Sequence, residues 1–164
     1  MFTTTRVATT ILLALLLFSL SRCGSVGGQV FQVTKPTTDA VGASDFEFDD
    51  PNFQGHIVVT VRFNRAADPG SVVVGKTQLF DTPGDHNAGG TLQWNGDQEF
   101  KFTTTKNRTD LLKGGGGTDV GFTLTLTGTD KGSGVIKAKD GTVLDGDKDG
   151  TAGGDYKRFF LLPG

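Results

Sequence analysis

The segment that most constrains the fold is His56–Asn64, HIVVTVRFN, in which apolar and polar residues alternate. Its apolar residues recur at every second position and would share one face of an extended strand: Ile57, Val59, Val61 and Phe63. A strand with a single apolar face is typical of an antiparallel sheet that is buried on one side and wet on the other. The segment therefore predicts a β protein.

Other short segments of this kind follow one another along the chain, separated by turn residues. They are Val30–Lys35, Val72–Val74 with Lys76–Phe80, Thr91–Asn95, Glu99–Thr104, Val120–Thr127, Val135–Lys139 and Tyr156–Leu162. The 25 glycines among 164 residues suit the tight turns between them. Outside the first 22 residues, no window of useful length has a helical pattern. These features predict one all-β domain, an antiparallel Ig-like β-sandwich of about seven to nine strands.

The core is expected to come from the apolar faces of these strands. The predicted inward residues are Ile57, Val59, Val61, Phe63, Trp94, Phe100, Phe102, Phe122, Leu124, Leu126 and Phe159. The net charge of −2 and the lack of a basic cluster give no indication of a nucleic-acid partner.

The first 22 residues have the features of an export signal. Arg6 precedes the apolar run Ile11–Leu20, ILLALLLFSL, which has the length of a signal-peptide core and is short for a bilayer span. A retained transmembrane anchor is the alternative. The sequence thus predicts a signal peptide at 1–22, a small polar tether at 23–29 and the sandwich domain at 30–164.

Cys23 is the only cysteine, so no intrachain disulfide can form. Leu20-Ser21-Arg22-Cys23 resembles a bacterial lipobox, in which a leucine lies three positions before a cysteine that receives a diacylglycerol; Arg22 departs from the small residue of that pattern. The resemblance implies a lipid anchor on Cys23 and a membrane-anchored lipoprotein of the cell envelope, for instance of the outer membrane. The alternative is a secreted protein that signal peptidase cleaves after Cys23.

An acidic, glycine-rich loop precedes the last strand within Leu144–Phe160, LDGDKDGTAGGDYKRFF. Calcium takes about six to eight oxygen ligands, and aspartates at every second residue let several carboxylates converge. Gly150 can adopt a positive φ and fold the chain around an ion. Asp145–Gly150 matches the D-x-D-x-D-G start of an EF-hand loop, but Tyr156 replaces the final glutamate and the flanks are strand-like. The loop resembles the D-x-D-x-D-G calcium loops of β proteins.

The predicted ligands are four carboxylates and one main-chain carbonyl: Asp145, Asp147, Asp149, Asp155 and the carbonyl of Thr151. They would form a weak Ca²⁺ site, with a Kd of about 10⁻⁴–10⁻³ M. The alternative is a solvated turn without metal, because aspartate and glycine are favoured in turns for their own sake.

Three segments together resemble bacterial Ig-like domains of the surface-layer-protein (SbsA) type. They are Ile57–Val72, Leu111–Leu126 and Val135–Phe160, within a resemblance that covers Val30–Leu162. The resemblance implies an antiparallel Ig-like sandwich that serves as a spacer or interaction module and is not an enzyme. This chain departs from the pattern because it has a single copy with its own export signal.

The motifs of catalysis are missing from the sequence. It has no G-x-S-x-G, H-E-x-x-H or C-x-x-C, and its two histidines, His56 and His86, are far apart. We therefore expect an exported, lipid-anchored, non-catalytic Ig-like module, stabilised by calcium, with a structural or interaction role toward an envelope protein or glycan. The alternative is a calcium-dependent ligand-binding module, for example for a glycan.

Overall fold

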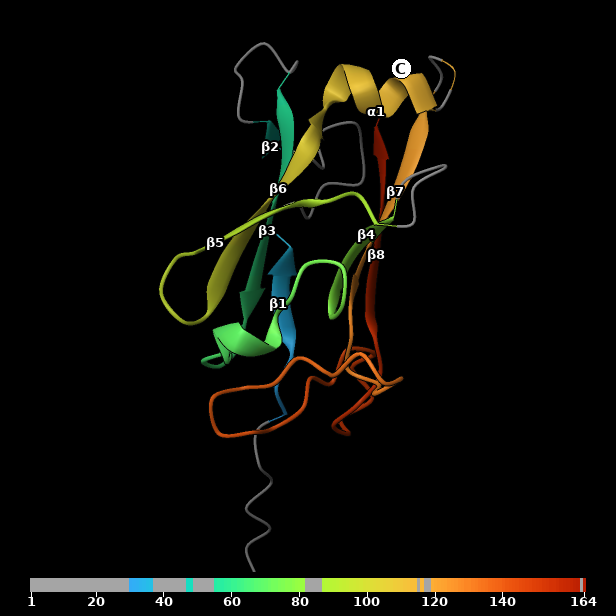
Figure 1. Cartoon of the computed structure of the whole chain (residues 1–164). Helices are drawn as coiled ribbons and strands as arrows, with labels where there is room; N and C mark the ends of the chain where they lie inside the picture. The colour runs from blue at the N-terminus through green and yellow to red at the C-terminus, as the bar shows by residue number, and fades with distance from the viewer. Residues whose placement is uncertain are drawn as a thin grey trace, which may run out of the picture.

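The computed structural model describes residues 30–36, 47–48, 55–81, 87–114, 116, 119–162 and 164. In this part of the chain the strands form two sheets that face each other (Figure 1). Helical structure there is limited to η1 (Pro69–Ser71), a 3-10 turn, and α1 (Arg108–Gly114). None of the helices described is long and apolar enough to cross a membrane.

The strand order is that of an immunoglobulin domain. One sheet has the order β1 (Val33–Pro36), β3 (His56–Phe63), β6 (Glu99–Asn107) and β5 (Gly90–Trp94), with the two-residue β2 (Glu47–Phe48) also paired to β3. The other has the order β4 (Gln78–Asp81), β7 (Val120–Leu126) and β8 (Tyr156–Leu162). All these pairs are antiparallel. Setting β2 aside, this is the ABED and CFG arrangement of a constant-type domain, so the predicted Ig-like β-sandwich is confirmed.

Phenylalanines contributed by both sheets form the centre of the core. The Phe80 ring of β4 contacts Phe102 of the opposite sheet at 5.6 Å between centroids. Within its own sheet it stacks on Phe122 at 5.5 Å and lies 6.4 Å from Phe160. All four side chains are at most 1% exposed, and burying such a side chain contributes about 1.5–3 kcal/mol.

The prediction that Phe159 faces the core is wrong. Phe159 is 63% exposed, whereas its neighbour Phe160 is buried. Pairing with β7 sets this register, because Phe160 lies opposite the buried Phe122 and Phe159 lies opposite Thr123. The Phe159 ring instead covers Gly121 on the outer face, where an added Cβ would approach the ring to 2.7 Å.

Three segments differ from the predicted secondary structure. Val72–Val74 is not part of a strand: only Val74 forms an isolated bridge, to Gln78, and the next strand begins at Gln78 itself. Val135–Lys139 is not a strand: the Ile136 amide donates to Thr127, the Ile136 carbonyl accepts from Leu144, and Ala138 bridges to Ala67. Its hydrogen bonds therefore go to separate segments instead of one neighbour. The short helix α1 was not expected; it follows Asn107, whose Oδ1 accepts from the Asp110 amide at 2.9 Å.

Residues 127–155, here called the β7–β8 connection, close one end of the sandwich (lower end in Figure 1). The connection buries Ile136, Ala138 and Leu144 against the core. It passes close to itself at Gly128, where an added Cβ would lie 1.9 Å from the Gly154 carbonyl oxygen and 2.6 Å from that of Leu144. The acidic loop lies in the second half of this connection.

Candidate metal centre

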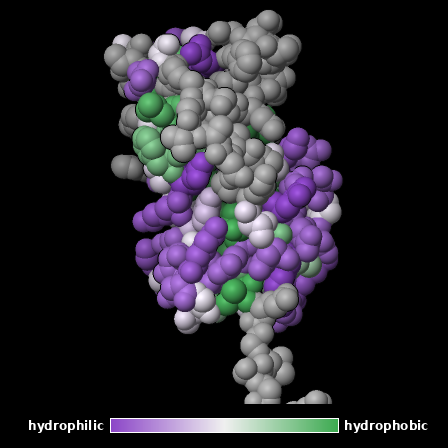
Figure 2. All heavy atoms as spheres, turned by 180° about the vertical axis from the view of Figure 1, so that it is seen from behind, coloured by the Kyte–Doolittle hydropathy of each residue, from purple (hydrophilic) through white to green (hydrophobic). Residues whose placement is uncertain are grey.

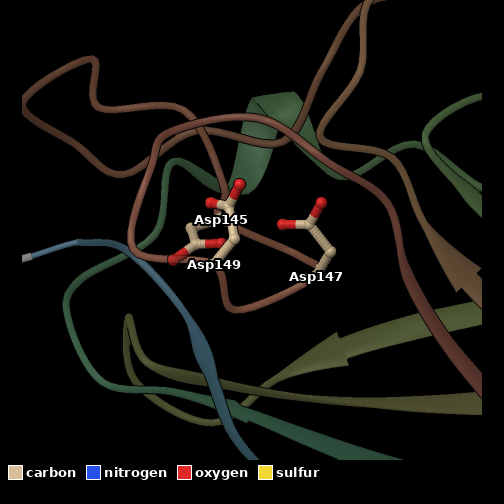
Figure 3. Close-up of side chains that lie close together, drawn as sticks. All are labelled: Asp145, Asp147 and Asp149. Atoms are coloured by element: carbon tan, nitrogen blue, oxygen red, sulfur yellow. The ribbon is translucent and has the colours of Figure 1, made fainter.

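Three aspartates of the acidic loop converge in the structure. One carboxylate oxygen from each of Asp145, Asp147 and Asp149 lies within 4.8 Å of the others (Figure 3). Asp145 is fully buried at the base of the loop, and Asp147 and Asp149 are exposed. Within the described residues, this is the one cluster of three or more acidic, histidine or cysteine side chains with the spacing of a metal site.

The main chain closes the loop that carries these side chains. The Gly146 amide donates to the Gly153 carbonyl at 3.0 Å, and the Gly153 amide donates to the Leu144 carbonyl at 2.9 Å. Between these points Lys148 has φ 62° and Gly150 has φ 90°, so the positive φ predicted for Gly150 is confirmed. Left-handed backbone at two positions turns the chain tightly enough to bring alternate side chains to one side.

The two carboxylate oxygens of Asp145 differ in their hydrogen bonding. Its Oδ2 accepts from Gln32 Nε2 at 2.6 Å and from the Gly150 amide at 3.1 Å. Its Oδ1 is buried and has no hydrogen-bond partner. A buried oxygen without a partner is costly and rare in native proteins. A cation bound between the three carboxylates would provide the missing partner.

The charge of the cluster points the same way. Burial by itself raises the pKa of Asp145, but hydrogen bonds, chiefly those from Gln32 and Gly150, outweigh that effect and lower the pKa below its ordinary value. Asp145 is therefore ionised at neutral pH. In the part of the chain that the structure describes, no lysine or arginine forms an ion pair with any of the three aspartates. Their mutual repulsion favours a bound divalent cation.

The structure does not bring Asp155 into this cluster. Its Oδ1 accepts from the amides of Gly128 and Thr129 at 3.2 and 3.0 Å, and its Oδ2 pairs with Lys131 Nζ at 3.2 Å. Asp155 therefore fixes the start of the connection, and its carboxylate is occupied by protein donors. The pattern of alternating aspartates could not show this, because the donors to Asp155 lie 24 to 27 positions earlier in the chain.

The other predicted site residues have different outcomes. The Thr151 amide donates to Asp149 Oδ1 at 2.7 Å, which orients that carboxylate; a ligand role for the Thr151 carbonyl stays a prediction. Cys23 lies outside the described residues, and its lipidation stays a prediction. Gln32 was missed altogether, since nothing in the sequence connects a strand-opening glutamine with a loop 113 positions later.

The surface seen from behind is mostly hydrophilic over the lower part of the molecule (Figure 2). The large hydrophobic side chains exposed among the described residues are Val73, Phe159 and Leu161. Phe159 and Leu161 lie on the outer face of β8.

Comparison of the chain with protein-family models gives no match, and comparison with curated proteins gives none either. The resemblance to Ig-like domains of the SbsA type therefore stays a prediction.

Proposed function

We propose that this protein is an exported, non-catalytic Ig-like module of the cell envelope whose β7–β8 connection binds calcium. The observation that carries the proposal is the buried Asp145, with one oxygen lacking a partner beside Asp147 and Asp149. The role of the ion is structural: it would hold together the loop that leads into β8, the last strand of the sandwich.

Calcium suits the site better than other common metals. The available ligands are all oxygen atoms, which hard cations prefer over softer transition metals. Asp145, Asp147 and Asp149 provide three carboxylates, and the carbonyl of Thr151 is the expected main-chain ligand, with water filling the remaining positions. The loop is irregular and partly exposed, which fits the variable geometry of calcium better than the strict octahedron of magnesium.

A calcium titration tests the proposal directly. Calcium should raise the melting temperature and EDTA should reverse the rise; at 100 times the Kd the stabilisation is about 2.7 kcal/mol, or several degrees for a domain of this size. Asp147→Ala should abolish the response, because Asp147 is exposed and its loss removes a ligand and little packing. Asp130→Ala, at another exposed aspartate of the β7–β8 connection, is the matched control and should respond as wild type. A wild-type melting curve unaffected by calcium would contradict the proposal.

The envelope location depends on Cys23 and is tested separately. If a lipid on Cys23 anchors the protein, Cys23→Ala should move it from a detergent-extracted membrane fraction to a soluble one. The same fractionation for both chains would remove the lipid anchor from the proposal and leave the calcium site unaffected.

The partner of the module is an envelope protein or a glycan. The exposed Phe159 and Leu161 provide an apolar contact surface on β8, which supports an interaction role. The alternative, a calcium-dependent binding module for a ligand such as a glycan, is distinguished by affinity: calcium would then change ligand binding as well as the melting temperature.

A further inference from the structure

The first residues of the described fold lie against the calcium loop. Phe31 forms a parallel bridge with Leu144, and the Asp145 amide donates to the Phe31 carbonyl at 2.8 Å. Phe31 and Leu144 are both fully buried. In Figure 1 the chain enters β1 at the end of the sandwich that the β7–β8 connection closes. Residues 30–32 are thus held by a segment that is more than 100 positions away in sequence.

Asn64, directly after β3, holds the same residues from the other side. Its Oδ1 accepts from the Gln32 amide at 2.9 Å, its amide donates to the Gln32 carbonyl at 3.0 Å, and its Nδ2 donates to the Val30 carbonyl at 2.8 Å. These bonds fix the main chain at Gln32 and leave its side chain directed to Asp145. The position of that side chain therefore depends on whether residues 30–32 are docked.

Gln32 contacts the Asp145 carboxylate directly. Its 2.6 Å hydrogen bond occupies Oδ2, and Oδ1 is left as the oxygen without a partner. Groups that orient a metal ligand in this way typically change metal affinity by about 10–100-fold when they are removed.

We propose that Gln32 is a positioning residue for the cation, and that docking of residues 30–32 and calcium binding strengthen each other. The inference rests on the proposed calcium site and adds its regulation: by linkage, if docking raises calcium affinity by some factor, calcium stabilises docking by the same factor. Calcium would thereby secure the end of the domain at which the polypeptide enters the fold.

Two measurements on the full chain, purified in a mild detergent because residues 11–20 are apolar, test the coupling. The first is calcium affinity by calorimetry for wild type and Gln32→Met, which keeps the length of the side chain and removes its N–H donor. We expect calcium binding about 10-fold weaker or more. Gln93→Met, on an exposed position of β5, is the control and should bind as wild type.

The second measurement is backbone hydrogen exchange of wild type with and without calcium, which needs no variant. Calcium should slow exchange in residues 30–34 and leave the β5–β6 turn at residues 95–98 unchanged. A merely structural role for Gln32 would instead lower the stability of Gln32→Met and leave its calcium affinity unchanged. If wild type binds calcium but Gln32→Met binds equally well and exchange at 30–34 is unaltered, the coupling is wrong and the site stands. If wild type binds no calcium, both proposals fall.

Discussion

Asp145 and Asp155 lie near the two ends of one acidic loop, but their carboxylates differ in the hydrogen-bond donors that surround them. Both side chains are largely removed from water, with Asp145 fully buried and the Asp155 side chain 13% exposed. Asp155 receives hydrogen bonds on both oxygens, from two backbone amides and Lys131. Asp145 receives bonds on Oδ2 alone and has two further carboxylates beside it.

The difference shows what separates a structural aspartate from a metal ligand. The residue type, the glycine-rich surroundings and the lowered pKa are common to both. What differs is the supply of protein donors: where donors satisfy the carboxylate no ion is needed, and where they do not a cation completes the set.

The largest expected effect comes from Gly128, whose amide donates to Asp155 and which lies against the carbonyl of Leu144, the residue before Asp145. Gly128→Ala places a Cβ 1.9 Å from the Gly154 carbonyl oxygen, so the β7–β8 connection must move, at a cost of about 3 kcal/mol. Chemical denaturation should show this loss, together with a weakened response to calcium. Gly132→Ala, in the same connection but with open space around it and φ 91°, should cost about 1 kcal/mol. Equal losses for the two variants would contradict the close contact.

An intermediate effect is expected at Asp145, and only when calcium is present. Asp145→Asn keeps an acceptor for Gln32 and Gly150 but removes one charge of the cluster. In EDTA the free energy of unfolding should change by about 1 kcal/mol or less, since the lost charge also relieves repulsion. At 100 times the wild-type Kd the variant should lack the stabilisation of about 2.7 kcal/mol that wild type gains. Loss of the same size in EDTA would make Asp145 a structural residue like Asp155.

The smallest effect is expected at Asp155, and it should depend on pH instead of calcium. Burial raises the pKa of Asp155, but bonds from Thr129, Lys131 and Gly128 lower it below the ordinary value of 3.8. The folded protein therefore holds this proton less tightly than the unfolded chain, so the stabilisation is present above pH 3.8 and disappears as pH falls through the folded pKa. Asp155→Asn should cost about 1 kcal/mol at pH 6.

Urea unfolding in EDTA at pH 6 and at pH 3 measures this prediction. The difference in stability between wild type and Asp155→Asn should shrink at the lower pH. In a separate titration at pH 6 without EDTA, the variant should respond to calcium as wild type does. A calcium response lost in this variant would place Asp155 among the ligands after all.

The sequence predicted the sandwich well because alternation records burial directly. The strand β8 has the predicted bounds, and β3 and β7 differ from theirs by one residue each. It failed where neighbouring positions offer the same chemistry, as with Phe159 and Phe160, since only the pairing with β7 decides between them. The sequence pattern predicted that Asp145, Asp147 and Asp149 lie together, and they do. It could not exclude Asp155 from that cluster or connect Gln32 with it, because the contacts that decide both cases come from distant segments.

The ring of Phe159 over Gly121 has a consequence for how this sequence can vary. A larger residue at 121 would occupy the place of the ring, and a small residue at 159 would uncover the glycine backbone. The two positions should therefore change together among descendants of this chain, with side-chain bulk passing from one strand to the other and their combined volume kept nearly constant.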